Sequence, residues 1–160
     1  ENKFLVRAIL DQGDTEVYFS DFIEKISSWN ARQKRILLIT EKALYTFDAS
    51  TFELKRRIRI AAIDCVHLSK DASDMFVVHV NGEHDHLYCA PKRPEIMYHL
   101  MRLYQALHPA HEHLTTRFGE RMVVDDKGNW RRDVLVPQSQ TVSFGTRSIF
   151  EAQKKFQQKS

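Results

Sequence analysis

Short runs of alternating apolar and polar residues recur between residues 17 and 90, which is the period-two pattern of β-strands. The clearest run spans residues 52–60, where apolar residues alternate with Glu53, Lys55, Arg57 and Arg59. Runs of this kind predict seven strands, over residues 17–26, 35–40, 43–47, 52–60, 63–68, 75–80 and 86–90. Turn-forming residues separate the runs, as Gly82 does between the last two, so we expect antiparallel hairpins.

A helix is predicted directly after the seventh strand. Pro91 ends the strand, and Pro94 suits the first turn of a helix, where proline loses no needed hydrogen bond. Apolar residues then recur at helical spacing up to Leu107, and Pro109 ends the pattern. The fold class is therefore α+β and mainly β. Seven strands followed by one helix resemble a pleckstrin-homology-like bent antiparallel barrel, in which the helix caps one open end and variable loops line the other.

The chain continues on both sides of this core. Residues 4–10 form an apolar opening that fits either a helical turn or an edge strand. Beyond the helix, residues 121–136 predict a β-hairpin around Gly128, and residues 141–144 a short strand. A capping box of Ser148 and Glu151 predicts a short C-terminal helix. We therefore divide the chain into a lead-in (1–15), the barrel with its helix (16–108) and a C-terminal extension packed on the barrel (109–160).

Composition limits the class of protein. Hydrophobic residues make up 42% of the 160 residues and charged residues 28%, which predicts one folded domain and excludes a disordered chain. No apolar run approaches the roughly 20 residues that cross a bilayer, and the opening tripeptide is no signal peptide, so any membrane contact is expected at the surface. Cys65 and Cys89 lie in predicted strands without a metal-ligand spacing, which favours free thiols over a disulfide.

Signatures of catalysis are missing from the sequence. The five glycines are scattered, so there is no phosphate-binding or dinucleotide-binding loop, and no nucleophile elbow or zinc-protease motif occurs. We expect no enzyme activity, no cofactor and no metal site. A net charge of +3 is low for a nucleic-acid-binding domain, so no nucleic-acid partner is expected.

Charge is segregated along the chain in a way that does indicate a ligand. Residues 11–24 carry five acidic residues and no basic one, whereas residues 25–59 carry nine basic and three acidic residues. Lys25 ends the first predicted strand, Lys34 begins the second, and Arg32 lies between them in the loop. Because adjacent phosphates need convergent cations, one on each arm of a hairpin, we expect these three residues to bind a phosphorylated headgroup. Arg35 points the other way, and general attraction to an anionic membrane is assigned to Arg35, Lys55, Arg57 and Arg59.

Residues 16–26 and 34–45, together with the strands at 54–60 and 74–80 and the helix near Glu95, resemble the tail-homology-one domain of class I myosins. The resemblance extends over roughly residues 4–145. It implies a lipid-binding module that recognises phosphoinositides, often phosphatidylinositol bisphosphate, and tethers an actin motor to membranes. Lys25 matches the lysine that closes the family's first strand, Lys34 the basic residue that opens its second, and Arg32 a loop contact.

The resemblance also implies partners and a location. It places the module in the cytoplasm, peripherally at the membrane or the cell cortex of the actin cytoskeleton, with anionic phospholipid as ligand. Within a myosin, actin and calmodulin-like light chains would bind through other domains. The alternative is a protein–protein interaction module with little lipid binding, because pleckstrin-like barrels also bind peptides along the groove between the fifth strand and the helix.

Overall fold

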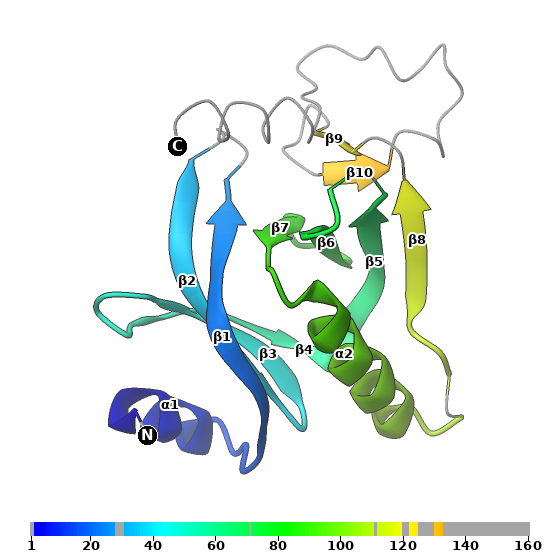
Figure 1. Ribbon diagram of the computed structural model, residues 1–160. Coiled ribbons are helices and arrows are strands. Elements are labelled where there is room, and N and C mark those ends of the chain that lie inside the picture. The colour runs from blue at the N-terminus through cyan, green and yellow to red at the C-terminus, as the bar shows by residue number, and fades with distance from the viewer. Residues whose placement is uncertain are drawn as a thin grey trace.

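The computed structural model describes residues 2–27, 31–70, 72–110, 112–119, 122–124 and 130–132 (Figure 1). Two sheets and two longer helices make up this part of the chain. The elements are α1 (Lys3–Asp11), β1 (Val17–Ile26), β2 (Arg32–Thr40), β3 (Ala43–Asp48), β4 (Leu54–Arg59), the short helix η1 (Ile60–Ala62), β5 (Ile63–Ser69), β6 (Met75–Val80), β7 (His86–Cys89), α2 (Arg93–Leu107), β8 (Thr115–Gly119), β9 (Met122–Val124) and β10 (Trp130–Arg132).

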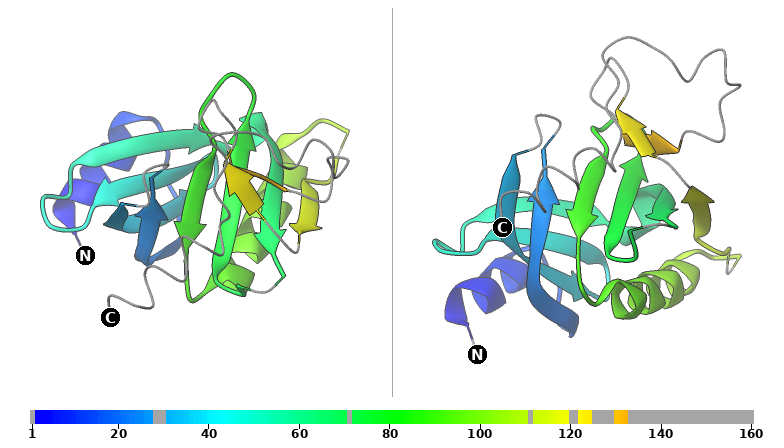
Figure 2. Two further views of the ribbon diagram at one scale, coloured as in Figure 1. Left: turned by 90° about the horizontal axis from the view of Figure 1, so that it is seen from above. Right: turned by 45° about the horizontal axis from the view of Figure 1, so that its top comes forward.

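The main sheet has eight strands in the order β4-β3-β2-β1-β7-β6-β5-β8. Its first seven strands pair antiparallel, as the sequence predicts. The long strand β1 pairs with β2 along its length and with β7 over its last three residues, so it joins the two halves of the bent sheet. The predicted barrel of seven strands with a helix after the last one is confirmed, and the views in Figure 2 show the two halves crossing.

The resemblance to the myosin tail also implies a further strand over residues 114–118, and β8 confirms it, but its pairing was not predicted. β8 pairs with β5 in parallel, with Cys65 opposite Thr115. A hairpin at 121–136 is confirmed in part, because β9 and β10 pair antiparallel within that range. The predicted strand at 141–144 and the C-terminal helix lie outside the described residues. Both cysteines are free thiols, as expected.

Two apolar layers hold the sheet. The main core lies inside the bend, where α2 inserts Ile96 and Leu100 between the two halves. A second core lies on the outer face of β2 and β3, where α1 covers the sheet with Leu5 and Ile9. The apolar opening of the chain is therefore a helix, and its start is capped by the side chain of Asn2, which accepts hydrogen bonds from the first-turn N–H groups.

Both faces of β2 and β3 are thus covered over residues 36–40 and 43–47, whereas the start of β2, at the mouth of the barrel, is more exposed. We call mouth the region between the end of β1, the start of β2, the β3–β4 turn and the β6–β7 turn, which a contact between Arg56 and Glu83 brings to β4. Side chains on the inner face of these strand ends reach into the barrel. Which residues take that face depends on the register of the strands.

Candidate functional site

The β1–β2 register separates the two predicted lysines. Lys25 lies opposite Gln33, and Lys34 lies opposite Glu24. Directly opposed residues share a face of the sheet and successive residues alternate, so Lys25 and Lys34 point to opposite faces. The prediction that the two ammonium groups converge is therefore wrong. It failed because the spacing along one chain does not reveal a register offset of one residue.

The outer wall of the hairpin carries Arg32 and Lys34. Arg32 forms an ion pair with Glu24, and the ammonium of Lys34 lies 5.1 Å from the centre of the Phe22 ring. The Phe22 side chain is exposed at 53%. A shallow hollow of about 160 Å³ beside them also contains Asp74, so acidic groups offset much of the positive charge on this wall.

The inner wall carries a second set of cations, which we name the inner basic cluster: Lys25, Arg35 and Arg56. Lys25 is half-buried. It lies opposite Tyr88 of β7, and the Tyr88 side chain is part of the main core. Burial lowers the pKa of Lys25, and the positive charges of Arg35 and Arg56 lower it further. Three like charges thus face one space, which favours an anionic ligand there.

Carboxylates flank two of these cations. The Arg35 guanidinium lies 3.6 Å from a carboxylate oxygen of Asp48, and the Arg56 guanidinium lies 2.6 Å from one of Glu83. Neither contact involves Lys25. In the described part of the chain, Lys25 makes no ion pair, so its ammonium is available to a ligand.

The space beneath the inner basic cluster is polar. Thr46 and Tyr88 are fully buried, and within the ranges that the structure describes their hydroxyl groups find no hydrogen-bond partner. The same holds for the buried Nε atoms of Arg35 and Arg56. Buried polar atoms are rarely left without partners in folded proteins. Hydroxyl and guanidinium donors at one mouth can satisfy a ligand with several anionic oxygens.

His86 completes the floor of the mouth. It is buried on β7, and its Nε2 lies 3.5 Å from the Glu83 carboxylate. Burial, together with the nearby charge of Lys25, lowers the pKa of His86 to about 4. The imidazole is therefore neutral at physiological pH and adds no charge to the site.

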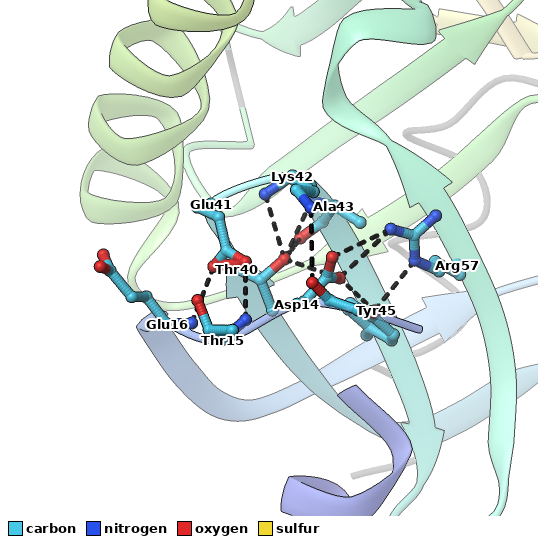
Figure 3. A network of polar contacts seen from close by, with 10 residues as sticks. Asp14, Thr15, Glu16, Thr40, Glu41, Lys42, Ala43, Tyr45 and Arg57 are labelled. Carbon is cyan, nitrogen blue, oxygen red and sulfur yellow. Dashed lines mark hydrogen bonds and ion pairs between the residues drawn. The ribbon is translucent and has the colours of Figure 1, made fainter. Parts of the chain in front are cut away.

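Arg57, expected to attract membranes, has a structural contact instead (Figure 3). Its guanidinium lies 3.2 Å from the Asp14 carboxylate, and its Nε donates a hydrogen bond of 2.9 Å to the Tyr45 hydroxyl. Tyr45 in turn donates to Asp14, as does Thr40. Asp14 is fully buried, so this ion pair balances a charge that water cannot reach.

The other two outer cations of β4 differ from one another. Arg59 is exposed and makes no ion pair within the described residues, whereas Lys55 lies 3.3 Å from Glu53. A bulge leaves Lys55 without a partner on β3, because Thr46 pairs with Arg56 and the next residue pairs with Leu54. The alternation predicted over residues 52–60 is therefore corrected: the bulge interrupts it at Lys55, so Lys55 does not continue the row of Arg57 and Arg59.

Sequence reasoning missed Arg56 and gave Arg35 too small a part. In the alternating pattern of residues 52–60, Arg56 stands where an apolar residue is expected, between Leu54 and Ile58. A cation at such a position was the signal that could have identified Arg56 as a site residue. Arg35 was correctly expected to point away from Lys34. What the sequence did not reveal is that this direction leads into the mouth, where the Arg35 side chain is only 12% exposed.

The described residues lack two further features. They include no helix long and apolar enough to span a bilayer. They also contain no group of three or more His, Cys, Asp or Glu side chains arranged to hold a metal ion.

Comparisons with known proteins identify relatives of this chain. Residues 1–159 match the family described as unconventional myosin tail, actin- and lipid-binding. A segment of the chain is 33% identical over 89 residues to the myosin IA heavy chain of Dictyostelium discoideum, covering 51% of this chain and 9% of that protein. The family is thus described by what it binds, actin and lipid.

Two solved structures share the fold at low identity. The C-terminal domain of a Leishmania infantum protein superposes with a TM-score of 0.53 at 16% identity, covering 62% of this chain and 94% of that one. The hSac2 domain of the human phosphoinositide phosphatase Sac2 gives 0.50 at 12% identity, covering 74% and 90%. At these identities the likeness concerns the fold alone.

Proposed function

Because this chain belongs to the family of unconventional myosin tails, we propose that it binds the headgroup of a phosphoinositide in the mouth of the barrel. The inner basic cluster of Lys25, Arg35 and Arg56 contacts the phosphates. Arg32 and Lys34 face the leaflet from the outer wall and add general attraction. The domain then lies peripherally on the cytoplasmic face of a membrane, and in a myosin it holds the motor there.

The observation that carries the proposal is the gathering of Lys25, Arg35 and Arg56 above buried hydroxyl groups that lack partners among the described residues. A diffuse basic surface would not suffice. Each Lys or Arg near an anionic leaflet contributes about 1 kcal/mol, so four or five cations reach only roughly millimolar to several hundred micromolar affinity. Charge-assisted hydrogen bonds inside a partly buried mouth contribute more per group, about 1.5–3 kcal/mol each.

Vesicle co-sedimentation tests the proposal with neighbouring residues as matched controls. Lys25→Ala and Arg35→Ala are expected to weaken binding to vesicles with phosphatidylinositol bisphosphate by about tenfold or more, because each removes charge-assisted bonds. Lys34→Ala and Arg32→Ala remove the same charge from the opposite face and are expected to weaken it by about fivefold at most. Thermal unfolding of each variant verifies that the domain is folded.

Three results decide the outcome. Larger losses for the inner-face variants support the proposal. Equal losses for all four variants indicate diffuse attraction and contradict it. Unchanged vesicle binding in all four overturns it as well, and leaves a protein as the main ligand of the module.

A further inference from the structure

We propose that Glu83 makes the mouth selective for inositol headgroups with at least two phosphate monoesters on the ring. This inference rests on the proposed function and concerns the same mouth. Glu83 neutralises Arg56 while the site is free, and a headgroup must displace that carboxylate to use all three cations. Headgroups with one phosphate monoester or none gain too little to do so.

The position of Glu83 fits this role. It lies on the β6–β7 turn, next to Gly82, which has a positive φ of 80°. Its carboxylate is 2.6 Å from the Arg56 guanidinium and 3.5 Å from the neutral His86 ring, and its side chain is 35% exposed. The contact with Arg56 lowers the pKa of Glu83, so the carboxylate stays ionised. A carboxylate on a turn and partly in water can leave the arginine without being buried elsewhere.

Asp48, the second carboxylate at the mouth, is held far more firmly. One of its oxygens accepts hydrogen bonds from the N–H groups of Ser50 and Thr51 and from the Ser50 hydroxyl, at 2.7–2.9 Å. These bonds hold the pKa of Asp48 well below its usual range. Its other oxygen faces Arg35 at 3.6 Å. The Asp48 carboxylate is therefore held in place by its own turn. Of the two carboxylates at the mouth, the Glu83 carboxylate is the one that a ligand can displace.

The charges explain the expected selectivity. The free mouth has three cations and two carboxylates, which leaves one unit of positive charge. A single phosphate that approaches Lys25 gains that attraction and is repelled by Glu83. A second phosphate can replace Glu83 at Arg56 and forms charge-assisted bonds in its place. Repulsion of the wrong ligand is a common source of specificity, and here one carboxylate supplies it.

Glu83→Gln tests the inference, since glutamine has the same shape and no charge. Binding is measured to vesicles that contain phosphatidylserine, phosphatidylinositol monophosphate or phosphatidylinositol bisphosphate. We expect binding to the first two to rise about threefold to tenfold and binding to the bisphosphate to change by less, so that the discrimination falls. Glu83→Ala is a second variant with the same expected direction.

Glu53→Gln is the matched control, because it changes the net charge equally at an exposed residue that pairs with Lys55. If Glu53→Gln and Glu83→Gln raise binding alike, the effect is one of net charge and the inference is overturned. An unchanged discrimination ratio, or weaker bisphosphate binding from Glu83→Gln, also overturns it. Failure of the proposed function is distinct, because Lys25→Ala would then leave bisphosphate binding unaltered.

Discussion

The carboxylate of Asp14, which has no exposed surface, lies 3.2 Å from the guanidinium of Arg57 in β4. Asp14 comes directly before β1, and Arg57 is in β4, at the other end of the β1–β4 half of the sheet. The ion pair therefore connects the segment that leads into β1 to the edge strand β4. Burial and the hydrogen bond to Asp14 raise the pKa of Tyr45 to about 12, so its hydroxyl stays protonated as a donor.

Arg57→Ala is expected to lower the free energy of unfolding by about 3 kcal/mol, because removing one partner leaves the charge of Asp14 buried and unbalanced. Urea unfolding measures this change. Arg59→Ala, two residues along the same strand and exposed, is the matched control and should shift stability by no more than about 0.5 kcal/mol. Equal stability of the two variants would show that the ion pair is not a structural requirement.

Arg93 at the start of α2 holds the β5–β6 loop. Its Nη1 donates to the carbonyl oxygens of Ser69, Ala72 and Met75 at 2.8–3.2 Å. Arg93→Ala removes all three bonds, so we expect a loss of about 2–3 kcal/mol in urea unfolding. Lys92→Ala removes only a surface pair with Asp21 and should cost at most about 1 kcal/mol. A variant Arg93→Ala as stable as Lys92→Ala would contradict this.

Acid should destabilise the domain through His86. Its pKa of about 4 in the folded chain lies below the unfolded value of about 6.5. The unfolded chain therefore binds the extra proton first, and stability that is complete above about pH 6.5 is lost as the pH falls towards about 4. The loss expected from this residue at about pH 5 is on the order of 1–2 kcal/mol.

Urea unfolding at neutral and acidic pH checks this in the wild type and in His86→Gln. The variant should lose less stability on acidification than the wild type. His84→Gln, on the same turn but exposed, should keep the wild-type pH dependence. If His86→Gln also keeps it, the burial of a neutral imidazole is not the cause.

Salt should distinguish the outer cations from the inner ones. Lys55→Ala and Arg59→Ala should each weaken vesicle binding by about fivefold at most, and moderate salt should abolish the difference from the wild type, because exposed charges are screened. The loss from Lys25→Ala should persist at the same salt, since that side chain is half-buried. Co-sedimentation over a salt series measures both, and identical salt dependence of the three variants would refute the distinction.

Much of the fold was predictable because the signals are local. The alternation of apolar and polar residues placed the first seven strands of the sheet, and the prolines with the helical spacing placed α2. The resemblance to the family indicated the strand β8, but its parallel pairing was not predictable, since its partner β5 lies far away along the chain. The apolar opening remained ambiguous for a similar reason: its helix is stabilised by the outer face of β2 and β3.

The sequence by itself determined the strands, the helix after them, the family and the position of a basic segment at the β1–β2 hairpin. Only the tertiary structure decided which cations share a face, because strand register depends on turns and bulges that a period-two pattern does not encode. The pairing of the strands placed Lys25 near Arg35 and Arg56, and it placed Lys34 on the outer wall. It brought Arg57 into an ion pair with Asp14. It also brought Glu83 from a distant turn to the mouth of the barrel.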